Sequence, residues 1–453
     1  MKWDEASRIL KGAWEEKSDD NDGSYFKEHI KEIIGKKDIF FEAAKKYGTP
    51  QYILDEEKLK KKAMNFMSTF RSYVPNSDFF YAFKSNDLPY LIKRLKSYGY
   101  YADVASLFEL QLALKIGFDK IIFTGPGKSD EELKLAIDNR DKVIINIDNE
   151  DELDRVMAFN EKARVSIRVN FGPDAVDVWS KFGISLNDLK RIALKAREKL
   201  ELAGFHFHSS WNDTPERYCN NIKMLGEYLK KNKITDFEFL DIGGGIYPED
   251  QATLSKFSHK YMLIEMIEEI SGKKIPFDFM KFSVDEVDSL DEFGRKISSY
   301  LRKYIFCLNK DIKIYFEPGR RISNNPTHIL LKVIAEKDGS VIVDGGMNLV
   351  GGLDFYDYAF SPIINLSNPS FKLNKKIIYG SLCKATDLWG YSFFGKDCKK
   401  EDILIVLMQG SYSFSRAWRL IKENAPYTVF DGKKLFLAKE REKFSDRYAG
   451  CKF

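Results

Sequence analysis

Cysteine is scarce in this chain, and it has no long hydrophobic run. Only 5 of its 453 residues are cysteines, and they are scattered without a Cys-x-x-Cys pair or the ligand spacing of a zinc site. A disulfide scaffold and a metal centre are therefore disfavoured, and a reduced cytoplasmic protein is expected. No apolar segment approaches the roughly 20 residues that are needed to cross a bilayer.

The chain also lacks an excess of charge of one sign. Its 72 Lys and Arg nearly balance its 68 Asp and Glu, which leaves a net charge of +4. This balance favours neither a nucleic-acid partner nor a membrane surface. Residues 1–23 alternate in charge and lack the apolar core of a secretory signal. The length and the hydrophobic content of 44% are typical of a globular protein with two domains.

From Gln51 onward, short apolar runs alternate with helix-length segments rich in Lys, Glu and Leu. The strand candidates are Phe79–Phe83, Tyr101–Val104, Ile121–Thr124, Val143–Ile147, Val165–Val169, Phe205–His208, Phe237–Ile242 and Ile312–Phe316. Eight strands separated by helices predict an α/β fold of the (β/α)8 barrel type. After Arg320 the runs look like strands with little helix between them, which predicts a second, mostly β domain.

These patterns predict three segments. Residues 1–48 are expected to contribute to the β domain, residues 49–322 to form the barrel and residues 323–453 to form the rest of the β domain. The stretch 248–310 interrupts the strand spacing and is interpreted as helices with an inserted loop. That loop is either a lid or a surface insertion, and the surface insertion is the favoured interpretation.

The segment Tyr81-Ala82-Phe83-Lys84-Ser85-Asn86 closes the first strand candidate. A lysine just past a buried barrel strand lies where the catalytic groups of this fold are usually found. Desolvation there disfavours the charged form, so the amine can act as a nucleophile. Most lysines of a chain are solvated surface residues. Lys84 therefore becomes a catalytic candidate only because other motifs accompany it.

Five further motifs follow Lys84 in order. They are His206-Phe207-His208, Asp241-Ile242-Gly243-Gly244-Gly245, Glu317-Pro318-Gly319-Arg320, Gly380-Ser381-Leu382-Cys383 and Gly410-Ser411-Tyr412. From about Thr49 to Ser415, this ordered set resembles the fold-type III (alanine-racemase-like) pyridoxal-phosphate decarboxylases. That group contains the diaminopimelate, ornithine and carboxynorspermidine decarboxylases. The resemblance implies pyridoxal 5'-phosphate as cofactor, a barrel plus a β domain, and a homodimer with shared active sites.

The resemblance also implies roles for single residues. Lys84 would form the Schiff base with the cofactor, and His208 would stack on its ring. Glu317 would face the pyridine nitrogen and keep it protonated, which makes the ring an electron sink. The other cofactor-binding residues that it implies are Asp103, Arg168, Gly243, Gly244, Gly245, Gly319, Arg320 and Tyr412. The three glycines follow a strand, so their backbone N–H groups can approach a phosphate.

The resemblance also concerns a proton donor and a phosphate contact. Cys383 matches the cysteine that returns a proton to the substrate, from the neighbouring subunit, and a thiol pKa can be tuned for that task. The family's serine after the second histidine, which helps to hold the phosphate, is replaced here by Trp211. Ser209 or Ser210 would then take over its contact, or the contact is lost.

The segment Asp344–Asn348 resembles a diaminopimelate decarboxylase stretch, but the residues expected to choose the substrate depart from it. Gly352 stands in place of an arginine that binds the distal carboxylate, whereas Tyr356 is kept. Lys384 follows Cys383 where the family has an acid that meets a distal amine. Asp387 matches a further family acid and would still contact an amine.

A lysine in place of an acid reverses the expected charge preference, unless Lys384 points to solvent. The main hypothesis is decarboxylation of an L-amino acid with a modified, conjugated, carrier-bound or anionic distal group in a specialised pathway. The alternatives are a diaminopimelate or ornithine/lysine-type decarboxylase of primary metabolism and a silent regulator derived from one. A racemase on the same scaffold is a further alternative, but Cys383 argues against it.

Overall fold

The computed structural model describes residues 27–172, 180–248, 252–253, 269, 272, 283–284, 287–351 and 361–453. These residues fall into two compact units, with boundaries between Leu59 and Lys60 and between Ile322 and Ser323. Among the described residues, the barrel unit contains residues 60–248 and 287–322. The β unit contains the residues before Lys60 and after Ile322.

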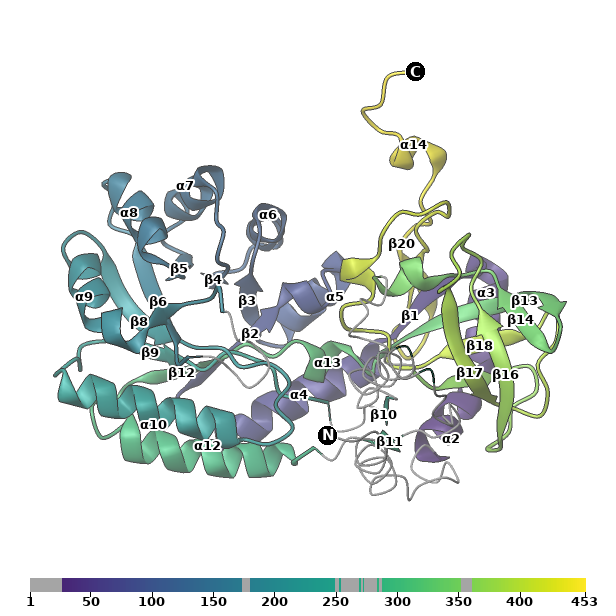
Figure 1. Ribbon diagram of the computed structural model, residues 1–453, viewed down its shortest axis with the longest axis horizontal. Coiled ribbons are helices and arrows are strands. Elements are labelled where there is room, and N and C mark those ends of the chain that lie inside the picture. Colours follow the sequence, from purple (N-terminus) through teal and green to yellow (C-terminus); the bar gives the residue numbers. More distant parts are fainter. Residues whose placement is uncertain are drawn as a thin grey trace. The chain divides into compact units, whose positions relative to one another are not determined.

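Parallel strands form a closed barrel in the first unit (Figure 1). They are β2 (Ser77–Ala82), β3 (Tyr101–Val104), β4 (Ile121–Phe123), β5 (Val143–Ile147), β6 (Arg164–Asn170), β8 (Glu201–His206), β9 (Phe239–Asp241) and β12 (Lys313–Phe316). Their order is β5-β4-β3-β2-β12-β9-β8-β6, and pairing of β5 with β6 closes the ring. The short β7 (Ile184–Ser185) pairs parallel with the end of β6. The predicted (β/α)8 barrel is confirmed, and each strand candidate overlaps one of these strands.

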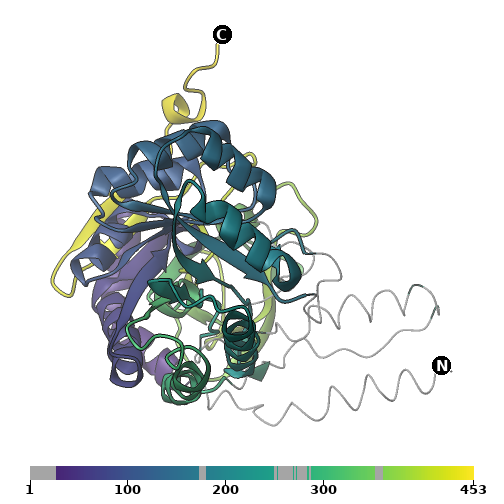
Figure 2. The ribbon, with the colours of Figure 1, turned by 90° about the vertical axis from the view of Figure 1, so that its left-hand side faces the viewer.

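Helices lie outside the barrel strands, as Figure 2 shows for the blue and teal segments. They include α4 (Glu56–Tyr73), α5 (Pro89–Ser97), α6 (Leu107–Ile116), α7 (Asp130–Asp138), α8 (Glu150–Ala158), α9 (Leu186–Arg197), α10 (Glu216–Lys231), α12 (Leu290–Tyr304) and the short α13 (Arg320–Ser323). Local sequence starts several of them. Ser106 and Asn149 cap α6 and α8, and Ser129 forms a capping box with Glu132 on α7.

Side chains from six barrel strands meet in one buried layer, made of Phe80, Ile122, Ile144, Ala203, Phe239 and Tyr315. Because these strands lie all around the ring, the layer must fill the barrel interior. The rings of Phe239 and Tyr315 stack with centroids 4.3 Å apart. The barrel is therefore a packed core, and the polar groups described below lie at the ends of its strands.

The β unit is built on a second sheet, with the order β14-β16-β17-β15-β18-β13-β1-β19-β20. Its strands are β1 (Gln51–Asp55), β13 (Thr327–Lys337), β14 (Ser340–Val343), β15 (Ile363–Asn365), β16 (Leu373–Tyr379), β17 (Leu388–Phe394), β18 (Ile403–Val406), β19 (Tyr427–Phe430) and β20 (Leu435–Lys439). A further pairing of β13 with β14 closes six of them on themselves. The predicted mostly β C-terminal domain is confirmed.

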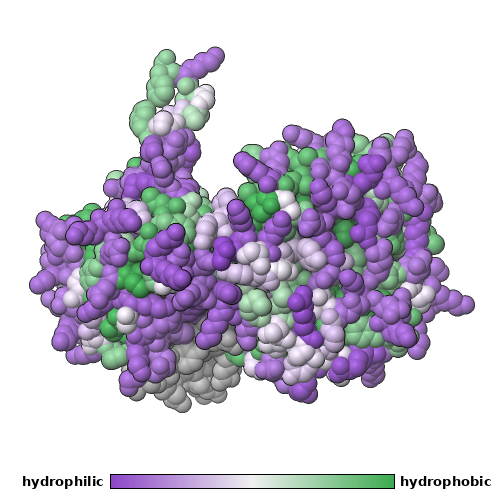
Figure 3. All heavy atoms as spheres, turned by 180° about the vertical axis from the view of Figure 1, so that it is seen from behind, coloured by the Kyte–Doolittle hydropathy of each residue, from purple (hydrophilic) through white to green (hydrophobic). Residues whose placement is uncertain are grey.

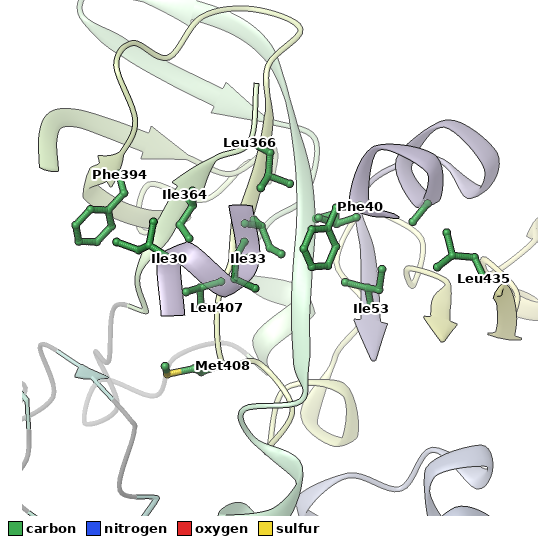
Figure 4. Close-up of a cluster of buried hydrophobic side chains, with 13 residues drawn as sticks. Ile30, Ile33, Phe40, Ile53, Ile364, Leu366, Phe394, Leu407, Met408 and Leu435 are labelled. Carbon is green, nitrogen blue, oxygen red and sulfur yellow. The ribbon is translucent and has the colours of Figure 1, made fainter. Parts of the chain in front are cut away.

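The N-terminal part of the described chain packs on this sheet. β1 pairs antiparallel with β13 and parallel with β19, so residues 51–55 lie in the β unit rather than after a border at residue 49. Helices α2 (Lys27–Gly35) and α3 (Lys37–Tyr47) place Ile30, Ile33 and Phe40 in a buried cluster with strand residues (Figure 4). Burial of these side chains anchors both helices.

Most of the stretch 248–310 lies outside the described residues. Within it, β10 (Ala252–Thr253) pairs antiparallel with β11 (Ser283–Val284), and α12 is the one long helix described there. Hydrophilic residues cover much of the surface seen in Figure 3. Among the described helices, none is both long and apolar enough to span a bilayer.

We expect Phe40→Ala to destabilise the β unit by about 3 kcal/mol, because it leaves a cavity between α3 and the sheet. Phe444→Ala is the control, since Phe444 in α14 (Phe444–Arg447) is 72% exposed and its loss should cost less than about 0.5 kcal/mol. Urea unfolding measures both. Equal effects of the two changes would contradict this packing.

Candidate active site

The motif residues of the barrel unit gather where its strands end. Lys84 lies in the 3-10 turn η1 (Phe83–Ser85) that follows β2, and Asp103 lies on β3. His206 ends β8, and Glu317 directly follows β12. Because the strands are parallel, their carboxyl ends share one rim of the barrel, where catalytic groups of this fold are found.

Lys84 reaches the rim with an accessible amine. Its Nζ lies 3.9 Å from Oδ2 of Asp103, and the Lys84 side chain is 37% exposed whereas that of Asp103 is buried. The amine can therefore meet a molecule that enters from solvent, while Asp103 lies behind it.

Glu317 is buried between two histidines. Its Oε2 lies 3.5 Å from Nε2 of His206 and 3.7 Å from Nδ1 of His208. These distances are longer than those of strong hydrogen bonds, so the carboxylate has two histidine neighbours but no short hydrogen bond to either of them.

Burial opposes charge on every acid of the rim, and the neighbours decide which one stays ionised. Burial alone would raise the pKa of Glu317, but His206, together with the nearby Lys84 ammonium, outweighs burial and holds that pKa well below its usual value. Burial, and then the charge on Glu317, raise the pKa of Asp103 well above its usual value. The same two causes raise the pKa of Asp241. The rim therefore keeps its negative charge on Glu317.

His208 is held as a neutral ring. The N–H of Gly244 donates to its Nδ1 at 3.2 Å, which leaves the proton of the ring on Nε2. Nε2 lies 3.4 Å from Oγ of Ser210, which can accept that proton's hydrogen bond. Burial lowers the pKa of His208 to about 4. A neutral, fixed imidazole suits stacking on a flat aromatic ligand.

The glycine run after β9 touches the ends of two neighbouring strands. A Cβ on Gly244 would lie 2.1 Å from the carbonyl oxygen of Glu317, and one on Gly245 would lie 1.9 Å from that of Ser209. Gly243 has a φ of +70°, and its N–H donates to Oδ1 of Asp241 at 2.8 Å. Only glycines permit this approach, which carries backbone N–H groups into the rim.

The rim fits pyridoxal phosphate. Among the described residues, neither carboxylate oxygen of Glu317 and neither ring nitrogen of His206 has a hydrogen-bond partner. Buried groups without partners are costly, and an ionised one more so, which points to a bound donor. A protonated pyridine nitrogen is such a donor for Glu317, and Lys84 offers the amine that binds an aldehyde.

Two arginines of the predicted site lie near aromatic rings. Arg168 pairs with Asp148 at 3.0 Å and lies over the Phe182 ring at 4.3 Å. The guanidinium of Arg320 lies 4.7 Å from the centre of the Trp211 ring, which is 55% exposed. Trp211, which replaces the expected serine, thus contacts a residue expected near the phosphate.

Gly319 precedes Arg320 and lies against the Lys84 turn. A Cβ on Gly319 would lie 3.0 Å from both Cβ and Oγ of Ser85. The predicted Gly319 thus brings the loop after β12 next to the loop after β2.

The remaining predicted residues belong to the β unit. Cys383 and Lys384 are exposed and Tyr412 is half-buried, with a φ of +59°. Asp387 is buried, and its two carboxylate oxygens accept from the N–H groups of Met347 and Leu382, both at 2.7 Å. Its predicted contact with a substrate amine would compete with these bonds. Tyr356 and Gly352 lie outside the described residues.

The sequence argument missed His206 and Asp241 as parts of the site, and it missed Asp148. The first two stand inside motifs that were recognised, at the last positions of β8 and β9. Their place at strand ends of a barrel was the signal that could have found them.

A parallel barrel whose rim carries a lysine, a buried carboxylate and a glycine run defines an enzyme of the pyridoxal-phosphate class. Residues 57–324, more than half of the chain, match the family described as pyridoxal-dependent decarboxylase, pyridoxal binding domain. The chain belongs to this family. It is an amino-acid decarboxylase that depends on pyridoxal phosphate, as the sequence predicted.

Relatives match along nearly the full chain. The diaminopimelate decarboxylase of Methanothermobacter thermautotrophicus is 27% identical over 445 residues, which cover 92% of this chain and 95% of the relative. That of Aquifex aeolicus is 27% identical over 432 residues, which cover 89% and 91%. The solved diaminopimelate decarboxylase of Helicobacter pylori, complexed with L-lysine, has a TM-score of 0.73 at 23% identity and shares the fold over 90% of this chain and 98% of that one.

We expect Gly244→Ala to weaken pyridoxal phosphate binding at least tenfold, because its Cβ would displace the backbone at Glu317. Gly127→Ala is the matched control in the same unit, since a Cβ there meets nothing within 4 Å. Titration of the cofactor's visible absorbance measures binding, and circular dichroism checks folding. Unchanged affinity in a folded Gly244→Ala protein would contradict the tight approach.

Acid should destabilise the cofactor-free protein through His208. Its pKa is about 4 in the folded state against about 6.5 when unfolded, so below pH 6.5 the unfolded chain binds more protons. Stability should fall from pH 6.5 to pH 4, by about 3 kcal/mol from this group. His208→Gln should flatten that part of the slope in urea unfolding, and an unaltered slope would exclude the assignment.

Proposed function

We propose that this enzyme decarboxylates diaminopimelate. The observation that carries the proposal is the match over about nine tenths of both chains to diaminopimelate decarboxylases. The segment Asp344–Asn348 adds to it. The hypothesis of a conjugated substrate in a specialised pathway has less support than this alternative, because no compared relative named above acts on such a substrate.

Lys84 and Glu317 would contact different atoms of the cofactor. We infer that the Lys84 amine would hold the cofactor through its aldehyde. The Glu317 carboxylate would keep a proton on the pyridine nitrogen of the cofactor, since Glu317 retains its charge although it is buried. Bound pyridoxal phosphate then supplies an electron sink for the electron pair that remains when CO2 leaves.

The other residues would orient the cofactor. The neutral His208 would pack against the cofactor ring, and the backbone of Gly243–Gly245 would bind the phosphate together with Gly319 and Arg320. Asp103 and Arg168 support the rim from behind. By resemblance to the family, Tyr412 would also contact the phosphate.

We assign the return of a proton to the substrate carbon to the Cys383 thiol. It is exposed on the β unit and forms no disulfide. In the family this cysteine comes from the neighbouring subunit, so we also propose a homodimer in which two chains complete each other's sites.

Lys84→Ala should remove the visible absorbance of the bound cofactor and lower the decarboxylation of diaminopimelate by a hundredfold or more, on the order of the loss for a positioned catalytic group. Lys134→Ala is the control, because its side chain is 62% exposed on α7. Mass spectrometry of the lysine product measures turnover.

The substrate panel should also contain ornithine, lysine and acylated diamino acids. Turnover of an acylated substrate alone, with the absorbance intact in the unmodified enzyme, would overturn diaminopimelate as the substrate.

A further inference from the structure

Asp387 ties two loops of the β unit together. Its Oδ1 accepts from the N–H of Met347, in the turn η3 (Met347–Val350), and its Oδ2 accepts from the N–H of Leu382. Gly346 packs against Leu382, since a Cβ on the glycine would lie 2.4 Å from Cγ of the leucine. The loop after β14 and the loop after β16 therefore keep one fixed arrangement.

The second loop presents Lys384 from a compact turn. The N–H of Lys384 donates to the carbonyl of Leu382 at 2.8 Å, and the N–H of Asp387 donates to the carbonyl of Lys384 at 3.0 Å. The Lys384 ammonium lies 5.8 Å from the centre of the Trp418 ring, within the range of a cation–π contact. The side chain thus lies toward Trp418.

Trp418 is joined in turn to the first loop. Its backbone N–H donates to the carbonyl of Asn348 at 3.1 Å. Gly351 lies against the nearby turn η4 (Phe414–Arg416), because a Cβ on it would meet Cβ of Arg416 at 2.4 Å. Lys384, Trp418 and Asn348 are therefore brought together from three loops of a single unit.

The carboxamide of Asn348 is buried, and the described residues do not satisfy its hydrogen-bonding groups. Its side chain is 1% exposed, and in the described part of the chain neither Nδ2 nor Oδ1 finds a hydrogen-bond partner. The buried Nε1 of Trp418 lacks one there too. Such orphaned groups are costly and rare, which points to a ligand that satisfies them.

The three side chains share one chemistry. Nζ of Lys384, Nε1 of Trp418 and Nδ2 of Asn348 are all hydrogen-bond donors, and one of them carries a positive charge. Asp387, the acid nearest to them along the chain, already accepts two backbone hydrogen bonds. A ligand with two acceptor oxygens and a negative charge, a carboxylate, matches this set.

We propose that Lys384, Trp418 and Asn348 bind the distal carboxylate of the substrate. The proposal rests on the proposed function, because diaminopimelate carries a second carboxylate on its far carbon. It also explains how the chain can do without an arginine at position 352, where it has glycine. The lysine after Cys383 then takes over the recognition of negative charge.

Two ligands isolate this contact. L-Lysine keeps the distal carboxylate of diaminopimelate, whereas 1,5-diaminopentane has the same chain and amines without it. Neither ligand carries the carboxyl group that leaves, so neither is turned over at that end. Their dissociation constants can therefore be measured by titrating the visible absorbance of the holoenzyme. The ratio of the two constants reports the distal carboxylate alone.

The unmodified enzyme should bind L-lysine at least tenfold more tightly than 1,5-diaminopentane. Lys384→Met should remove most of this preference, and Asn348→Ala should reduce it, while affinity for 1,5-diaminopentane stays within about twofold. Lys433→Met, at an exposed lysine of the same unit, should keep the preference.

A preference that survives Lys384→Met, or that is missing from the unmodified enzyme, overturns the subsite. Equal weakening of both ligands would also overturn it, since that marks general damage. Failure to decarboxylate diaminopimelate would refute the proposed function, whereas the two-ligand ratio would still decide the subsite.

Discussion

The ionised Glu317 is the constraint on which the barrel rim depends. A carboxylate that is 2% exposed would ordinarily take up a proton, because burial penalises its charge. Here two histidines flank it, and the neighbouring Asp103 and Asp241 give way by becoming easier to protonate. The rim thus holds one charge in a place where a cofactor nitrogen can use it.

Close backbone contacts keep that charge in position. Gly244 lies against the carbonyl of Glu317, and its N–H also selects the tautomer of His208. The glycine run therefore has two tasks, because it offers N–H groups to a phosphate and it aligns the groups that meet the cofactor ring. Membership of the pyridoxal-dependent decarboxylase family agrees with this arrangement.

In the β unit, the buried acid Asp387 has a structural role that differs from that of Glu317. Asp387 accepts two backbone hydrogen bonds and so fixes the loops that carry Cys383, Lys384 and Asn348. A residue predicted from the sequence to contact substrate thus has a structural role that its motif did not reveal. The proposed subsite links two differences from the family pattern. Gly352 replaces an arginine, and Lys384, which replaces an acid, supplies a positive charge in its stead.

Local sequence determined the barrel strands, since alternation of apolar runs with helix-length segments depends only on near neighbours in the chain. It also determined the order of the motifs, and through them the family and the cofactor. Tertiary structure alone decided that β1 joins the β unit, that Glu317 keeps its charge, and that Asn348 and Trp418 lie with Lys384. These outcomes depend on burial and on contacts between residues far apart in the chain, which no local pattern encodes.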